Sequence, residues 1–385
     1  MRPLSKRTDT FSESGIRSMT FNENYSGAIN LGQGYPDFDP PAALLERLHD
    51  RNLPHQYELT PGSAAFRDAL SKKQSRSLGR PIDPDAELLV TNGSTEAMMT
   101  ILMTLLEPGE TVAVFSPYYE NYISQARLLG ASIDYVELTG CDFSIDFDRL
   151  EDVMRKRPKV LILCNPSNPS GKVFTRDELL KIAAFAEKYD VYIVTDEVYE
   201  HIVYDGREYV YFQTLPGMWD RTAACGSLSK TYSITGWRLG YAVAGPAIIR
   251  RAKKVHDFLA ICAPAPLQYA AIAGLLQERG YYDDLTSQYQ RRKEIFTGGL
   301  RSLGWEINEP QGAYYVLANI ARFKPEGDLA FCRKLAREYG VLAVPGYCFR
   351  REERTDTVRF HFAKTEEALN EALNRLEGLG TRRCF

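Results

Sequence analysis

Short apolar runs alternate with helical patterns between residues 88 and 194, and this alternation constrains the fold more than any other feature of the chain. The apolar runs predict buried strands at Leu88–Thr91, Thr111–Phe115, Val160–Leu163 and Val191–Val194. The segments between them carry apolar residues at helical spacing, over 96–106, around 122–126 and over 175–189. Strands that are apolar throughout and separated by helices are typical of a mostly parallel sheet covered on both faces. The sequence therefore predicts an α/β fold.

The pattern changes after Gly240, where longer helical segments replace the alternation. Helices are expected over 247–260, 267–276 and 281–303, and the last eighty residues mix strands at 313–317 and 357–362 with helices at 328–339 and 366–376. We predict a large domain over residues 38–285 and a smaller α+β domain over 286–385. Residues 1–37 are expected to form an N-terminal arm and part of the small domain.

Composition excludes several classes of protein. The formal net charge of -3 argues against a nucleic-acid binder, which usually carries a basic excess. No run approaches the ~18 apolar residues of a membrane span, and the amino terminus lacks the apolar stretch of a secretory signal. The seven cysteines form no Cys-x-x-Cys pair, and the five histidines show no metal-binding spacing. We therefore expect a cytoplasmic protein without a metal site.

Lys230 stands in the segment Ser227–Tyr232, and together with three polar residues upstream it indicates a candidate binding site. Asp196 and Tyr199 follow the strand predicted at 191–194, and Asn168 follows the strand at 160–163. A lysine for a Schiff base, an acid for a pyridinium nitrogen and donors for a phenolic oxygen are what a pyridoxal phosphate site needs. A lone lysine is far more often a surface charge. The ordered set favours a site, because ligands bind where the carboxyl ends of parallel strands meet.

The two central residues have distinct chemical roles. A carboxylate at Asp196 would keep a pyridine nitrogen protonated, so that the ring accepts electrons from the substrate α-carbon. The alternative for this aspartate is a cap on the turn after its strand. Lys230, once released by an amino-acid substrate, could carry the α-proton. Burial and nearby cations such as Arg238 are expected to lower its pKa from about 10.4.

A phosphate group would need donors and positive charge. Ser94 and Thr95 lie between a predicted strand and a predicted helix, and a helix start offers free backbone N–H groups. Ser227 and Arg238 could complete the phosphate site, because arginine presents forked donors. Taken alone, Ser94 and Thr95 are as well explained as helix caps.

Two further residues are candidates for the site. Tyr119 could stack on the cofactor ring, although aromatic residues there more often pack in a core. Arg359 stands among apolar residues in a predicted strand, so its charge must be paired. The partner is either a substrate α-carboxylate or an internal carboxylate.

Four longer segments carry a resemblance to a known family. They are Ile29–Phe38 (INLGQGYPDF), Thr195–Gly206 (TDEVYEHIVYDG), Leu215–Trp219 (LPGMW) and Ser227–Gly240. With these segments, nearly the whole chain resembles the class I aminotransferases of PLP fold type I. Within that class it is most similar to the group of kynurenine aminotransferases, glutamine transaminase K and methionine aminotransferases. The resemblance implies pyridoxal 5'-phosphate as cofactor, an L-amino acid and a 2-oxo acid as substrates, and a homodimer.

The resemblance also implies a role for individual residues. Lys230 corresponds to the Schiff-base lysine, Asp196 to the partner of the ring nitrogen, and Tyr199 with Asn168 to the donors for the phenolic oxygen. The phosphate would be held by Ser94, Thr95, Ser227, Arg238 and, from the neighbouring subunit, Tyr57. Arg359 would bind the substrate carboxylate, helped by Asn168 and the backbone near Gly34.

The chain departs from the kynurenine enzymes at three aromatic positions of the pocket. Ile16 replaces a tryptophan, Thr95 a tyrosine, and Ile261 with Cys262 an aromatic and histidine pair. Weaker stacking favours methionine, glutamine or a similar amino acid over kynurenine. Two alternatives remain: a cysteine-S-conjugate β-lyase, which needs the same residues, and a regulatory PLP-binding module, for which the residues before Ile29 are too few to hold a DNA-binding domain.

Overall fold

The computed structural model describes residues 2–20, 25–351 and 355–381, so Cys384 lies outside the described residues. An eight-stranded sheet forms its centre, in the order β2-β9-β8-β7-β6-β3-β4-β5. The strands are β2 (Leu88–Thr91), β3 (Thr111–Ser116), β4 (Ser132–Thr139), β5 (Ser144–Ile145), β6 (Val160–Cys164), β7 (Tyr192–Asp196), β8 (Thr222–Ser227) and β9 (Gly240–Ala244). Strands β4, β3, β6, β7 and β8 are parallel, whereas β9 runs antiparallel to both neighbours. The predicted α/β fold with a mostly parallel sheet is confirmed.

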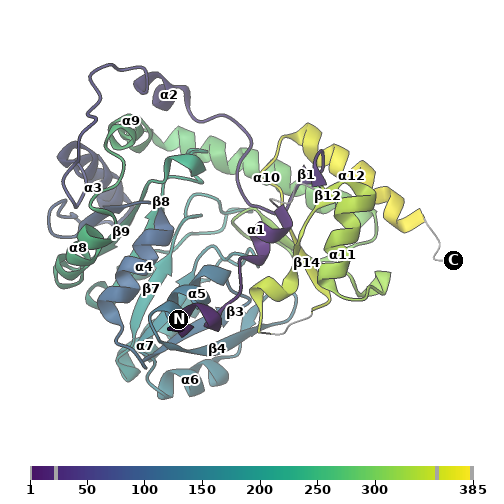
Figure 1. Cartoon of the computed structure of the whole chain (residues 1–385), viewed down its shortest axis with the longest axis horizontal. Coiled ribbons are helices and arrows are strands. Elements are labelled where there is room, and N and C mark those ends of the chain that lie inside the picture. Colours follow the sequence, from purple (N-terminus) through teal and green to yellow (C-terminus); the bar gives the residue numbers. More distant parts are fainter. Residues whose placement is uncertain (1, 21–24, 352–354, 382–385) are drawn as a thin grey trace.

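Helices cover both faces of this sheet (Figure 1). One face packs against α4 (Ser94–Leu105), α5 (Glu120–Leu128) and α8 (Pro246–Ala260), and the other against α6 (Phe147–Arg155) and α7 (Arg176–Tyr189). Near β2 and β9 lie α2 (Ala42–Arg47), α3 (Ala64–Leu78) and α9 (Ala265–Leu275). A capping box between Thr175 and Glu178 fixes the start of α7.

A second sheet of four strands, in the order β10-β11-β14-β13, forms the smaller unit. Its strands are antiparallel: β10 (Glu306–Ile307), β11 (Tyr315–Asn319), β13 (Val344–Pro345) and β14 (Thr357–His361). The helices around it are α10 (Arg279–Ser302), α11 (Asp328–Lys334) and α12 (Glu366–Thr381). The helix predicted over 328–339 continues beyond α11 as a π-helical turn, Leu335–Tyr339.

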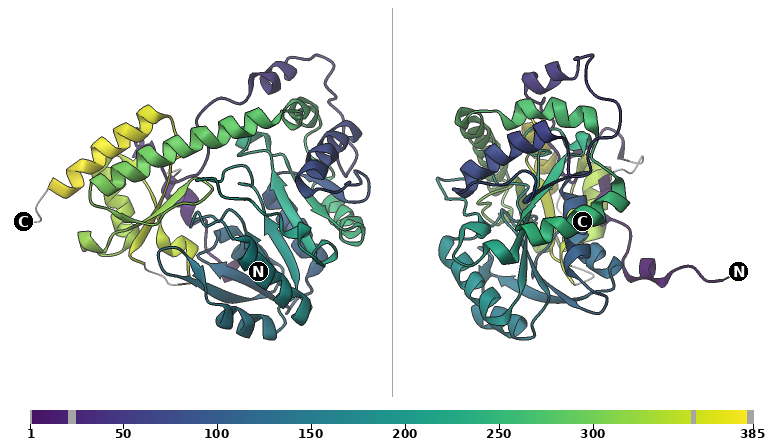
Figure 2. Two further views of the ribbon diagram at one scale, coloured as in Figure 1. Left: turned by 180° about the vertical axis from the view of Figure 1, so that it is seen from behind. Right: turned by 90° about the vertical axis from the view of Figure 1, so that its left-hand side faces the viewer.

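The N-terminal segment runs along the smaller unit. Its helix α1 (Gly15–Thr20) contacts β13, and β1 (Ile29–Asn30) pairs in parallel with β12 (Val341–Leu342). Figure 2 shows the first residues extending away from the body of the molecule. Helix α10 runs unbroken from the large sheet to the small one (Figure 1). The domain boundaries placed at residues 37 and 285 from the sequence stay predictions.

No helix among the described residues is long and apolar enough to cross a membrane. No group of three or more His, Cys, Asp or Glu side chains within 2–20, 25–351 and 355–381 could hold a metal ion. The six cysteines in these ranges are free thiols.

Candidate active site

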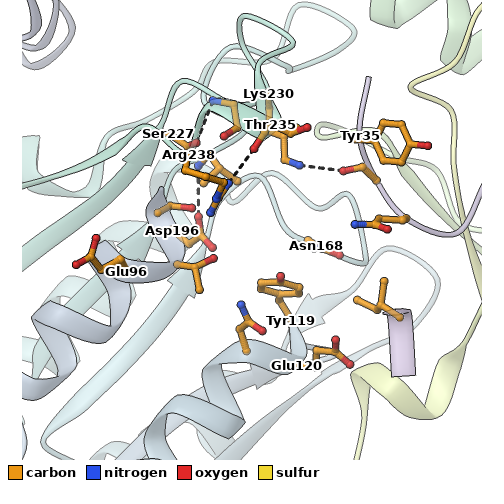
Figure 3. A pocket seen from close by; sticks show the side chains of 18 of the residues that line it. Tyr35, Glu96, Tyr119, Glu120, Asn168, Asp196, Ser227, Lys230, Thr235 and Arg238 are labelled. Carbon is orange, nitrogen blue, oxygen red and sulfur yellow. Dashed lines mark hydrogen bonds between the residues drawn. The ribbon is translucent and has the colours of Figure 1, made fainter. Parts of the chain in front are cut away.

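A cavity of about 780 Å³ opens at the carboxyl ends of β6, β7 and β8, where the smaller unit and α1 approach the large sheet (Figure 3). Twelve of the thirteen predicted site residues line it: Ile16, Gly34, Ser94, Thr95, Tyr119, Asn168, Asp196, Tyr199, Ser227, Lys230, Arg238 and Arg359. They converge because Asp196 ends β7, Ser227 ends β8 and Asn168 follows β6. The thirteenth, Tyr57, does not line the cavity and is 81% exposed.

Lys230 holds its amine inside this cavity. Its Nζ donates a hydrogen bond to the carbonyl oxygen of Gly34 at 2.9 Å. Burial, and after it the positive charges of Arg238 and Arg359, lower the pKa of Lys230 to about 8, against the opposing effect of Asp196. At neutral pH roughly one tenth of the amine is therefore uncharged and nucleophilic, far more than for an ordinary lysine, and the sequence predicts a shift in this direction.

Asp196 presents a buried carboxylate to the cavity. Its Oδ2 accepts a hydrogen bond from the Tyr122 hydroxyl at 2.6 Å, and its Oδ1 accepts one from the backbone N–H of Val198 at 3.4 Å. Burial raises the pKa of Asp196, and these hydrogen bonds act against that rise. Among the described residues no ion pair to Asp196 forms within 4.0 Å. A protonated ring nitrogen would supply the missing positive charge.

Arg359 is a buried guanidinium that pairs with no carboxylate among the described residues. Only 1% of the residue is exposed. Its Nη1 donates to Asn168 Oδ1 at 2.8 Å and its Nη2 to the Gly32 carbonyl at 2.7 Å, while Nε has no partner within the described part of the chain. Its carbon Cζ lies 4.3 Å from the ring centre of Tyr315. The internal carboxylate considered from the sequence is absent from these contacts, so the site fits a bound anion.

The opposite end of the cavity gathers donors at the start of α4. Gly93 has φ of +78°, and a Cβ there would lie 2.3 Å from Arg238 Nη2. Arg238 donates to the backbone carbonyl of Thr235 at 3.0 Å and has no carboxylate partner among the described residues. The buried Oγ of Ser229 is also without a partner there. Free N–H groups of a first helical turn, an arginine and an orphaned hydroxyl fit a phosphate.

Several residues of the site were not predicted from the sequence. Tyr315 shares a 2.8 Å hydrogen bond between its hydroxyl and that of Tyr199. Glu96 accepts from the backbone N–H of Asn92 at 2.5 Å and lies 2.9 Å from His256 Nδ1, which holds the 92–96 loop against α8. The sequence carries one signal for Tyr122, because this residue lies one helical turn after the predicted site residue Tyr119. In the structure the two rings pack edge to face with their centres 5.6 Å apart.

Together these groups form one end suited to a phosphate, a central amine, and one end suited to a carboxylate. The carboxylate of Asp196 lines the same cavity (Figure 3). The residues present therefore fit pyridoxal phosphate and an amino acid bound beside it.

Comparison with known proteins defines the class. The chain belongs to the class I and II aminotransferases, because the model of that family matches residues 26–376. Enzymes of this family use pyridoxal 5'-phosphate, and the chain is such an enzyme by fold and sequence.

Individual relatives are similar along their full length. The structure resembles N-succinyldiaminopimelate aminotransferase from Mycobacterium tuberculosis with a TM-score of 0.92 and 31% identity, covering 98% of this chain and 100% of that one. Methionine aminotransferase from Escherichia coli is 32% identical over 91% of this chain and 92% of its own. Kynurenine–oxoglutarate transaminase from Dictyostelium discoideum is 29% identical over 97% of this chain and 95% of its own. These names cover different amino acids, so the subgroup stays a prediction.

Proposed function

We propose that this protein transfers the amino group of an L-amino acid to a 2-oxo acid, with Lys230 as its catalytic amine. The observation that carries the proposal is that this amine shares one cavity with a carboxylate, Asp196, and a guanidinium, Arg359, neither of which forms an ion pair with a described residue. Pyridoxal phosphate, when bound, supplies an electron sink for the bonds at the substrate α-carbon.

Each side chain then has a defined task. Lys230 Nζ would accept the proton from the substrate α-carbon, and its lowered pKa favours the uncharged amine that this step needs. Asp196 would keep the ring nitrogen protonated, and Tyr122 fixes the orientation of its carboxylate. Tyr199 and Asn168 would donate to the phenolic oxygen, and Tyr119 would stack on the ring. The phosphate would be held by Ser94, Thr95, Ser227 and Arg238.

Arg359 orients the substrate. Its guanidinium is held by Asn168 and the Gly32 carbonyl, and its ring contacts with Tyr315 and Phe349 exclude water. A carboxylate bound there would be desolvated and fixed, which strengthens the pairing and directs the α-carbon of the substrate toward Lys230.

We propose methionine or glutamine as the preferred amino donor. This preference goes with membership in the group of kynurenine aminotransferases, glutamine transaminase K and methionine aminotransferases. The wall next to the substrate is the aliphatic Ile16, which packs with Val344, Cys348 and Phe349. In a stopped-flow panel of about twenty donors, we expect methionine or glutamine to convert the cofactor absorbance faster than kynurenine, because an aliphatic wall stacks poorly on an aromatic ring. A faster reaction with kynurenine would contradict this preference, and no conversion by any donor would contradict the transaminase itself. The β-lyase alternative stays a prediction that no observation here favours.

We also propose a homodimer in which Tyr57 completes the phosphate site of its partner. The surface beside the cavity exposes large apolar side chains: Tyr57, Leu59, Phe258, Leu259 and Ile261. Phe258 is 92% exposed, and its neighbour Leu259 lines the cavity itself. The loop of Tyr57 is tied to α8 because Thr60 Oγ1 donates to Asp257 Oδ1 at 2.8 Å. An apolar surface that borders the cavity is suited to burial against a second copy of the chain.

Replacing Tyr57 with phenylalanine should weaken cofactor binding roughly 10-fold to 100-fold, because one hydrogen bond to a charged phosphate is lost. Equilibrium titration of the apoprotein with pyridoxal phosphate measures this, and analytical ultracentrifugation checks that the dimer persists. A heterodimer of Tyr57→Phe and Lys230→Ala subunits provides the control. One of its two sites has an intact lysine and receives Tyr57 from the other subunit, so that site should bind with wild-type affinity. Unchanged affinity in the Tyr57→Phe homodimer would contradict the role across the interface.

A further inference from the structure

Glu120 places a negative charge on the wall of the cavity. It is the first residue of α5, it is partly buried, and its side chain lines the cavity (Figure 3). Its Oε1 accepts a hydrogen bond from the hydroxyl of Ser14. Within the described ranges of the chain, no ion pair to Glu120 forms at 4.0 Å or less. The proposed transfer reaction does not use this carboxylate.

Glu120 lies on the part of the wall that faces a substrate side chain. With the α-carboxylate on Arg359 and the phosphate near Arg238, Glu120 belongs to the part of the lining that neither group occupies, together with Ser14 and Ile16. Burial raises the pKa of Tyr119, the charge of Glu120 raises it further, and that of Arg359 lowers it. The charges of Glu120 and Arg359 thus both affect the Tyr119 hydroxyl. The negative charge of Glu120 therefore reaches the region where Arg359 would bind the substrate carboxylate.

Arg17 lines the same cavity and forms no ion pair with Glu120 within 4.0 Å. It is exposed, so solvent and salt screen its charge more than that of the partly buried Glu120. A carboxamide can donate to Glu120 and accept from Arg17, which satisfies both. A carboxylate at the same place would meet the less screened negative charge of Glu120.

We propose that Glu120 is a specificity-determining residue that rejects a carboxylate at the end of the substrate side chain and admits neutral side chains, above all those with a hydrogen-bond donor. This rests on the proposed transaminase function and specifies its substrates. Both half-reactions use one cavity, so the selection applies equally to the amino donor and to the acceptor. The acceptor is therefore a 2-oxo acid with a single carboxylate. Two like charges in the same partly buried cavity alter binding roughly 10-fold to 100-fold.

The test compares L-glutamine with L-glutamate, which match in size and differ in terminal charge. For the wild-type holoenzyme we expect kcat/KM in the first half-reaction to favour glutamine at least about 10-fold. Glu120→Gln keeps an acceptor for Ser14 and should lower this ratio about 10-fold or more, chiefly by improving glutamate. The same ratio should change in the second half-reaction with 2-oxoglutarate and its terminal amide. The exposed Glu326, far from the cavity, provides the control variant Glu326→Gln, which should keep the wild-type ratio.

A binding measurement separates charge from structure. Glutarate and its monoamide do not react, and their inhibition constants should differ in the same direction, with the difference shrinking at high salt and in Glu120→Gln. A wild-type ratio near one, or a ratio that Glu120→Gln leaves unchanged, overturns the proposal. It is also overturned if Arg17→Gln alone abolishes glutamate turnover, because Arg17 would then bind a terminal carboxylate. If methionine converts the cofactor while these ratios fail, only the selection by Glu120 is wrong; if no amino acid does, the transaminase is wrong.

Discussion

Replacing Lys230 with alanine is expected to slow the first half-reaction by at least about 10⁴-fold, because general acid–base catalysis and the covalent link to the cofactor are lost together. No other lysine among the described residues lines the cavity, so no second amine is in place to act instead of Lys230. Stopped-flow absorbance with methionine or glutamine measures the rate.

Two controls distinguish a catalytic role of Lys230 from a structural one. Lys181→Ala removes an exposed lysine on α7 and should react at the wild-type rate. Added methylamine should restore part of the lost rate in Lys230→Ala, since a free base can enter the vacated space. A Lys230→Ala protein that still reacts within about 10-fold of the wild type would contradict the assignment.

Replacing Asp196 with asparagine should lower kcat by about 10³-fold, while the fold and the cavity are kept. The amide has the shape of the carboxylate but no charge, so it cannot hold the ring nitrogen in its protonated form. The loss corresponds to about 4 kcal/mol of transition-state stabilisation. Single-turnover kinetics with a saturating donor measures this loss separately from substrate binding.

Tyr122→Phe is the matched control for Asp196. It removes only the 2.6 Å hydrogen bond to Oδ2 and keeps the negative charge, so its effect should stay near 10-fold. Similar losses in Tyr122→Phe and Asp196→Asn would show that orientation of the carboxylate matters and its charge does not.

The strands of the large sheet were predictable where they are strongly apolar. The runs at 88–91, 111–115, 160–163 and 191–194 all became strands of this sheet. A strand was expected before residues 227–230 but without bounds, because the sequence TAACGS of β8 (Thr222–Ser227) consists of small residues with weak strand preference. It is nevertheless fully buried between β7 and β9, so tertiary packing decides its structure.

The candidate site was predictable where residues follow strands. Asp196, Asn168 and Ser227 converge because parallel strands end at one edge of the sheet. Tyr122 and Glu120 could not be placed in this way, because the angle at which α5 leaves β3 determines which of its side chains face the cavity. Tyr57 is a different case, since its proposed site lies on a second copy of the chain.

Reduction with borohydride, followed by peptide mapping, tests the central claim most directly. The purified protein is incubated with pyridoxal phosphate, reduced and digested, and the mass of each lysine peptide is measured. We expect a stoichiometric cofactor adduct on Lys230, at the bottom of the cavity, and no adduct there in Lys230→Ala. A stoichiometric adduct on another lysine, or none at all, would contradict the catalytic site described above.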